Sequence, residues 1–209
     1  MSERPKESWG SGDAYELWVG RWSRIIGGAF VDWLAIPPGQ TWGDVGCGTG
    51  ALAGCILGRS DPAGVLGVDR SEAYVCEARN RVGDARARFE VGDACALPWT
   101  SATCDVTVSG LVLNFVPDSD AMVHEMLRVT RPGGRVAAYV WDYAGGMQMI
   151  RHFWDVALAL NRDDAQLDQA ERFPLCQPDP LEQLFRRVGL NSVSVRAIDV
   201  PTVFRDFED

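Results

Sequence analysis

The fold of this chain is decided by residues 42–50, which read WGDVGCGTG. A short apolar segment ends at Val45, glycines follow at every second position, and residues 51–57 then place apolar side chains at helical spacing. The stretch therefore predicts a strand, a tight turn and a helix. Glycine lets such a turn adopt positive φ and removes the Cβ that would hold a ligand away. The helix start adds unpaired amide hydrogens, so a small polar ligand can rest on the turn.

The composition predicts a single domain that handles a small molecule. The chain has 209 residues, 46% hydrophobic and 23% charged, which are ordinary values for a soluble domain. No apolar run approaches the roughly 18 residues that span a bilayer, and residues 1–12 lack the apolar centre of a signal peptide, so we expect a cytoplasmic protein without a membrane span. The net charge of −9 argues against a nucleic-acid partner, and a homodimer remains open.

The cysteines predict no metal site. The chain has 6 of them, and no two form a CxxC pair of the kind that builds a zinc site. Reduced, mostly buried thiols are the expected state in this class of protein. Cys47 lies in the glycine turn and could be a nucleophile, but its neighbours favour a small filler beside a ligand.

Acidic residues follow three predicted strands. Asp44 lies in the first strand, and Asp69 closes the apolar run 65–69 at about the 20-residue spacing after the glycine turn at which a carboxylate reaches a ribose. Asp93 follows the strand predicted at 89–91. Since ligands collect at the carboxyl ends of parallel strands, these aspartates should face one crevice. Asp69 could instead cap the helix that begins near Ser71, a role that Ser71 itself can fill.

With these residues in place, the chain resembles the class I S-adenosylmethionine-dependent methyltransferases of the ubiquinone and menaquinone biosynthesis type (methyltransferase type 11). An acidic residue, one residue and then GxGxG is the first motif of that family, and residues 97–99 (LPW) and 131–134 (RPGG) match two further hallmarks. The resemblance covers roughly residues 15–204. It implies a three-layer, Rossmann-like α/β sandwich with a mostly parallel, twisted sheet. It also implies S-adenosyl-L-methionine as cofactor and methyl transfer to oxygen, nitrogen or carbon of a small-molecule acceptor.

The resemblance assigns roles around the cofactor. The glycine turn approaches the methionine part and the ribose, Asp69 takes the ribose hydroxyls, Asp93 accepts from the adenine amine, and the amide of Ala94 reaches a ring nitrogen. The full set of expected cofactor-binding residues is Tyr15, Arg21, Asp44, Gly46, Cys47, Gly48, Gly50, Asp69, Arg70, Asp93, Ala94 and Gly110.

The organisation expected along the chain is a disordered tail (1–12), an N-terminal helical lid (13–36) and the cofactor-binding domain (37–209). Tyr15 and Arg21 either pack in the core or belong to a lid, where Arg21 could pair with a carboxylate. Gly27-Gly28 is a potential break in this helix. Residues 163–171 are predicted to be an exposed polar stretch, and residues 193–200 an edge strand. No residues remain for the antiparallel seventh strand of the family, so the sheet is expected to be truncated or to close differently.

The catalytic residues stay unknown at this stage. Only His152, Asp142 and Tyr143 are candidates for a base, which a hydroxyl acceptor would require. Many relatives have His where this chain has Asn114, and a neutral amide cannot act as a base. Aromatic residues such as Phe115 suit a flat or apolar substrate. Two alternatives remain open: an NAD(P)-dependent oxidoreductase, which the GxGxG spacing disfavours, and a non-catalytic S-adenosylmethionine-binding protein.

Overall fold

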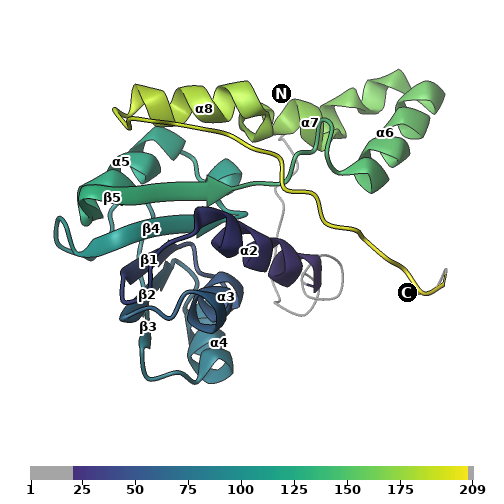
Figure 1. The fold of residues 1–209 in the computed structure, drawn as a ribbon. Coiled ribbons are helices and arrows are strands. Elements are labelled where there is room, and N and C mark those ends of the chain that lie inside the picture. The colour runs from purple at the N-terminus through teal and green to yellow at the C-terminus, as the bar shows by residue number, and fades with distance from the viewer. Residues whose placement is uncertain (1–20, 207–209) are drawn as a thin grey trace.

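A parallel sheet covered by helices on both faces forms the body of the protein (Figure 1). The computed structural model describes residues 21–206. Strands and helices alternate for most of the chain, as the sequence predicts, because an apolar strand must be covered by a neighbouring layer, and only residues 92–103 join two strands without a helix. The strands are β1 (Thr41–Val45), β2 (Gly64–Asp69), β3 (Ala87–Val91), β4 (Cys104–Gly110) and β5 (Thr130–Tyr139). The α-helices are α2 (Arg21–Leu34), α3 (Ala51–Arg59), α4 (Glu72–Val82), α5 (Ser119–Val129), α6 (Gln148–Leu160), α7 (Gln169–Arg172) and α8 (Pro178–Arg187), and short 3₁₀ turns are η2 (Leu113–Phe115), η3 (Arg162–Leu167) and η4 (Pro174–Cys176).

The sheet order β3-β2-β1-β4-β5 creates a switch point at its centre. Every neighbouring pair is parallel. The chain runs outward from β1 to β3 and then returns to place β4 on the other side of β1. Ligands of open parallel sheets bind outside the carboxyl ends of the strands at such a reversal. The turn after β1 and the segment after β4 therefore border the expected crevice.

The two faces of the sheet carry separate apolar clusters. On one face, α2, α3 and α4 contribute Phe30, Ile56 and Val75 to a cluster around Trp42. On the other face, α5 and α8 contribute residues such as Met122, Met126 and Leu184, which pack on Val45 and Val68. Side chains alternate across each strand, so Trp42 and Val45 belong to different clusters. The predicted three-layer α/β sandwich is confirmed.

Helix α2 runs without a break through Gly27 and Gly28, so the potential break predicted there is wrong. A Cβ on Gly27 would lie 3.3 Å from the hydroxyl of Tyr139, and one on Gly28 would lie 2.9 Å from Nε of Arg59. These glycines let the helix pack closely on its neighbours, and tertiary packing outweighs their poor helix propensity. Residues 1–20, with the predicted tail, Tyr15 and the start of the predicted lid, lie outside the described residues.

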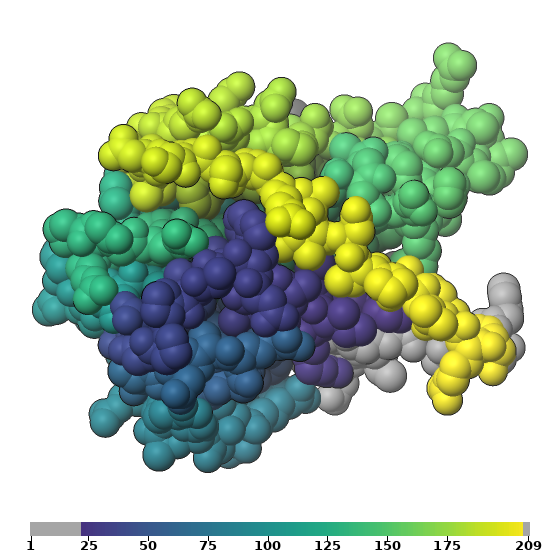
Figure 2. Space-filling view, in the orientation of Figure 1, coloured from purple at the N-terminus to yellow at the C-terminus, as the bar shows by residue number. Residues whose placement is uncertain are grey.

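The edge strand predicted at residues 193–200 is also wrong, because this segment has no strand structure. It crosses the face between α8 and α2 (Figure 2, yellow) and lines a cavity of about 1030 Å³ together with the outer edge of β5. A strand needs a neighbouring backbone with which to exchange hydrogen bonds, and an alternating sequence alone does not supply one. Within residues 21–206, β5 is the last strand of the sheet. Every helix in that range is too short or too polar to cross a bilayer.

Candidate functional site

The glycine turn after β1 is fixed by its own backbone. The N–H groups of Gly46 and Cys47 donate to the carbonyl of Val68 at 2.8 and 2.9 Å, and the N–H of Gly50 donates to the carbonyl of Cys47 at 2.9 Å. Gly46, Gly48 and Gly50 all have positive φ, at 75°, 51° and 86°. The turn is therefore rigid, and its path suits glycine at all of these positions.

The glycines of the turn differ in what they make room for. A Cβ on Gly46 would lie 2.6 Å from Cγ1 of Val112, and one on Gly50 would lie 2.7 Å from Cγ2 of Val82. A Cβ on Gly48 would meet nothing within 4 Å. Gly46 and Gly50 thus serve close packing of the protein on itself, whereas Gly48 leaves one side of the turn bare.

Asp44 is a buried carboxyl group that forms no hydrogen bond within the described residues. Its side chain is 1% exposed, and neither carboxylate oxygen has a hydrogen-bond partner within the described residues. Burial, and to a smaller extent the negative charge of Asp69, raises the pKa of the Asp44 carboxyl to about 7, and the nearby backbone N–H of Ala53 opposes this rise without forming a hydrogen bond of good geometry. A buried carboxylate without a hydrogen-bond partner is costly, so Asp44 either holds a proton or pairs with a cation.

Asp69 and Asp93 lie at the carboxyl ends of adjacent strands, as predicted. Asp69 ends β2, where its carboxylate accepts from the N–H of Gly48 at 3.0 Å and from the N–H of Ser71 at 2.9 Å. Ser71 caps α4, so Asp69 is not needed for that role. Asp93 is exposed just beyond β3, and its Oδ1 accepts from the N–H of Cys95 at 2.8 Å. Carboxylate oxygens hold more than one lone pair, so both residues can accept further hydrogen bonds.

Other expected cofactor-binding residues lie around this edge. Burial, with the charges of Asp44 and Asp69, raises the pKa of the Cys47 thiol, so no thiolate nucleophile forms there at neutral pH. Gly110 ends β4, and a Cβ on it would lie 2.6 Å from the hydroxyl of Tyr139. Ala94 is half-buried and Arg70 is exposed. Arg21 is the first residue of α2.

The base candidates lie in less suitable surroundings. Oδ1 of Asp142 accepts from the N–H groups of Ala144 and Gly145 at 3.1 and 2.9 Å, so this carboxylate caps a turn. Tyr143 is buried, with its ring centroid 5.6 Å from that of Phe173. His152 is exposed on α6. Asp44 is buried, and its carboxylate oxygens accept no hydrogen bond within the described residues. None of the three base candidates is known to have both properties.

The segment after β4 holds a feature that the sequence did not reveal. Leu111 has φ of 61°, an unusual conformation for leucine, and its N–H donates to the carbonyl of Tyr139 at 2.9 Å. This reversal brings Val112 against the glycine turn and leads into η2, where the buried Nδ2 of Asn114 has no partner within the described residues. The local sequence pattern cannot predict a buried polar atom without a hydrogen-bond partner, because this depends on the position of every neighbouring element.

Aromatic rings gather beside this segment. Phe173 lies 5.2 Å from Phe115 and 5.6 Å from Tyr143, centroid to centroid. The three rings come from η2, from the turn after β5 and from the end of α7. Phe115 and Tyr143 were expected near an acceptor, and Phe173 was not singled out. Phe115 directly follows Asn114 in the chain, so this aromatic cluster adjoins the segment after β4.

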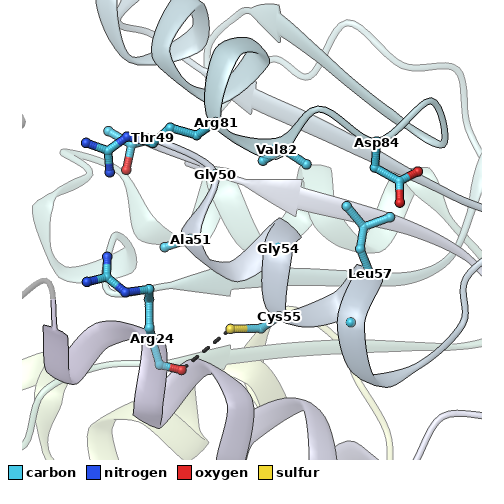
Figure 3. Close-up of a pocket in the computed structure, with 11 residues that line it drawn as sticks. Arg24, Thr49, Gly50, Ala51, Gly54, Cys55, Leu57, Arg81, Val82 and Asp84 are labelled. Carbon is cyan, nitrogen blue, oxygen red and sulfur yellow. Dashed lines mark hydrogen bonds between the residues drawn. The ribbon is translucent and has the colours of Figure 1, made fainter.

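A second hollow, of about 470 Å³, lies outside α3 (Figure 3). Small residues of α3, including Gly54 and Gly58, form its floor, and Arg24 and Arg81 come from the helices on either side. The thiol of Cys55 donates to the carbonyl of Arg24 at 3.5 Å and joins α3 to α2. The hollow touches the turn only at Thr49 and Gly50, and none of the crevice aspartates lines it. It is therefore separate from the crevice.

Comparison with known proteins identifies the family. Residues 43–138 match the model of a methyltransferase domain. The chain is 38% identical over 207 residues to the ubiquinone/menaquinone biosynthesis C-methyltransferase UbiE of Cereibacter sphaeroides, covering 91% of this chain and 78% of that one. It is 29% identical to the demethylmenaquinone methyltransferase of Halalkalibacterium halodurans, covering 78% and 72% of the two chains. Among solved structures, an S-adenosylmethionine-dependent methyltransferase of Thermotoga maritima has the same fold, with a TM-score of 0.60 at 21% identity and coverage of 85% and 75%.

The residues that carry the predicted first motif lie within the matched region, and the alternation of parallel strands and helices agrees with the fold of the solved methyltransferase. The predicted cofactor, S-adenosylmethionine, and the predicted reaction type are those of this family. The chain belongs to the class I S-adenosylmethionine-dependent methyltransferases of the ubiquinone and menaquinone biosynthesis type and is an S-adenosylmethionine-dependent methyltransferase.

Proposed function

We propose that this methyltransferase acts on a ring carbon of a small hydroquinone-type acceptor. The names of its relatives support carbon as the acceptor atom and a quinone-type ring as the substrate class. The observation that carries the cofactor half of the proposal is the unpartnered carboxylate of Asp44 beneath the glycine turn. The ammonium of S-adenosylmethionine is the kind of cation that such a carboxylate requires.

The described residues offer a candidate partner for each polar part of this cofactor. Asp44 would pair with the ammonium, and the bare side of the turn at Gly48 would face the chain between the ammonium and the ribose. Asp69 would accept from the ribose hydroxyls, while Asp93 and the N–H of Ala94 would recognise adenine. The roles of Tyr15, Arg21, Cys47, Arg70 and Gly110 stay predictions. When bound, the cofactor supplies a methyl group carried on a positively charged sulfur.

The acceptor would lie between the aromatic cluster and Asn114. A flat ring would pack against the aromatic side chains of Phe115, Tyr143 and Phe173. Nδ2 of Asn114 would donate to a ring oxygen and so fix which carbon faces the methyl group. Holding the two reactants in line can lower the barrier by on the order of 7 to 11 kcal/mol, so a special catalytic residue is not required.

The proton of the methylated ring carbon has to leave, and Asn114 cannot take it. Asp142 is the carboxylate nearest in sequence to the aromatic cluster, but the turn it caps already occupies one of its oxygens. Tyr143 could act only through its hydroxyl, and His152 is open to water. We infer that water carries this proton away, which an activated hydroquinone ring allows.

A panel assay tests the proposal. The purified protein is incubated with S-adenosylmethionine carrying a trideuterated methyl group and with a short-chain demethylmenaquinol analogue, a catechol or histamine. The expected result is a mass gain in the quinol alone, with the deuterated methyl on a ring carbon by NMR. Transfer only to oxygen or nitrogen would refute carbon methylation. Binding of S-adenosylhomocysteine without any turnover would favour the non-catalytic alternative.

The remaining expectations about partners belong to the same proposal. The acidic composition supports a small-molecule partner rather than nucleic acid, and a cytoplasmic location stays a prediction. A homodimer also stays a prediction, which sedimentation of the full chain would test.

A further inference from the structure

The loop between β3 and β4 carries Asp93 and Ala94, and it is held from outside by α5. Apart from a bridge between Asp93 and Ala96, no strand or helix stabilises residues 92–103. A loop of this length would normally be mobile. Two charged side chains of α5, Glu125 and Arg128, reach its backbone instead.

Glu125 and Arg128 form hydrogen bonds with the backbone of Leu97 and Trp99. Oε2 of Glu125 accepts from the N–H of Leu97 at 2.7 Å, and Nη2 of Arg128 donates to the carbonyl of the same residue at 3.1 Å. Nη1 of Arg128 donates to the carbonyl of Trp99 at 2.8 Å. Both polar backbone groups of Leu97 are therefore paired with α5. We call Glu125 and Arg128 the α5 clamp.

The clamp residues also fix each other. Nε of Arg128 donates to Oε1 of Glu125 at 2.6 Å, and Nη2 donates to Oε2 at 2.7 Å. Hydrogen bonding from Arg128 lowers the pKa of Glu125, so the carboxylate stays charged. A guanidinium can hold a carboxylate with two donors and still reach two carbonyls, whereas a lysine ammonium acts as one point charge.

Two further hydrogen bonds hold the loop on either side of Leu97. The carbonyl of Asp93 accepts from the N–H of Ala96 at 3.1 Å, so residues 93–96 form a tight local turn. The indole N–H of Trp99 donates to the carboxylate of Glu90 on β3 at 2.5 Å. The clamp therefore holds the residue that directly follows this turn, and a shift of Leu97 would move the turn with it.

We propose that Glu125 and Arg128 are positioning residues for adenine recognition. The inference rests on the proposed cofactor contacts of Asp93 and Ala94 and adds what orients them. A site that reads a base edge by hydrogen bonds needs its donors and acceptors held before the ligand arrives, since ordering them on binding weakens affinity. The clamp provides this order from a helix whose Met122 and Met126 are fully buried.

The test compares two ligands that differ only on the adenine ring. Calorimetry measures the affinity of the full chain for S-adenosylhomocysteine and for S-inosylhomocysteine, in which a carbonyl replaces the amine. The wild type should prefer the adenine form. Arg128→Lys and Glu125→Gln should each lower that preference by about fivefold, the scale of one hydrogen bond.

A matched control variant distinguishes a loss of adenine positioning from a general loss of protein stability. Arg187 forms a similar two-donor pair with Asp120 of α5, at 2.8 and 2.9 Å, but it does not contact the loop. Arg187→Lys should leave the ligand preference unchanged. A loss of thermal stability common to Arg128→Lys and Arg187→Lys would not by itself change the preference ratio.

Two results would overturn the inference in different ways. An unchanged preference in both Arg128→Lys and Glu125→Gln would refute the positioning role while leaving the cofactor site intact. A wild type without any preference for the adenine form would refute the proposed contacts of Asp93 and Ala94, and the clamp would then have nothing to position. If Arg128→Lys does not fold, Glu125→Gln gives the same comparison.

Discussion

Two buried aspartates differ in whether their carboxylates have partners. Asp44 lies beside the glycine turn, and Asp168 lies in the helical region 148–172. They are 1% and 3% exposed. Asp168 accepts from Nη2 and Nη1 of Arg151 at 2.6 and 3.3 Å and from the N–H of Ala170 at 2.9 Å. Asp44 has no partner within the described residues.

The paired aspartate has a structural role. The Asp168 pair joins α6 to the start of α7, and Nη1 of Arg151 also reaches the carbonyl of Tyr143 at 3.4 Å. The indole of Trp154 adds a hydrogen bond to Gln169 at 2.6 Å. Asp168 is thus paired within the helical region, whereas the carboxylate of Asp44 forms no hydrogen bond within the described residues, which is why we propose a ligand cation for it.

The largest expected effect is a pH dependence that comes from Asp44. Its pKa is about 7 in the folded protein and 3.8 in the ordinary case, so the folded state holds the proton more tightly. The free energy of unfolding without ligand should fall as pH rises from about 4 to 7, and then level off. Between pH 5 and pH 8 the wild type should lose roughly 3 kcal/mol relative to Asp44→Asn. Urea unfolding of both proteins measures this, and parallel pH profiles would contradict it.

The next effect tests the paired aspartate. Arg151→Met leaves Asp168 buried without its partner and should lower the free energy of unfolding by about 2 to 3 kcal/mol, below the range for a fully buried pair because Arg151 is partly exposed. The affinity for S-adenosylhomocysteine should stay the same, since the pair lies outside the crevice. Arg151→Lys, which keeps the charge, should lose less stability. Equal losses in both variants would show that geometry, not charge, dominates.

A third effect should appear in binding rather than in stability. Asp44→Asn removes the charge proposed to meet the ammonium, so the affinity for S-adenosylhomocysteine should fall by about tenfold to a hundredfold. Calorimetry at pH 8 gives the measurement. Asp32→Asn, at an exposed acid of α2 that pairs with Arg59, serves as control and should bind normally. Normal binding by Asp44→Asn would remove the ammonium contact from the proposal.

The smallest effect comes from a pair that is open to water. Arg187 and Asp120 join α8 to α5, but their side chains are 56% and 44% exposed. Arg187→Met should therefore change the free energy of unfolding by less than about 1 kcal/mol, and added salt should reduce even that difference. A loss as large as that of Arg151→Met would show that burial does not explain the difference between the two ion pairs.

Much of the fold follows from local pattern. The apolar run ending at Asp69 and the glycines of residues 46–50 predict a strand and a turn wherever they occur, because backbone preference and side-chain alternation act over a few residues. The strand-end positions of Asp44, Asp69 and Asp93 follow from those boundaries. The polar stretch 163–171 shows the limit: it was expected to be exposed, yet it contains the buried Asp168. Its partner Arg151 lies on another helix, and no local signal joins them.

The sequence by itself determined the order of β1 to β5 and of the helices between them, the glycine turn and the acidic strand ends, because each depends on neighbours along the chain. Only the tertiary structure decided that residues 193–200 remain irregular, that α2 continues through Gly27 and Gly28, and that Glu125 and Arg128 hold the loop of Asp93. It also decided that Asp168 finds a partner while Asp44 and Asn114 do not. The physical reason is that a hydrogen bond or an ion pair depends on which distant groups come within about 3 Å, and a periodic pattern does not contain that information.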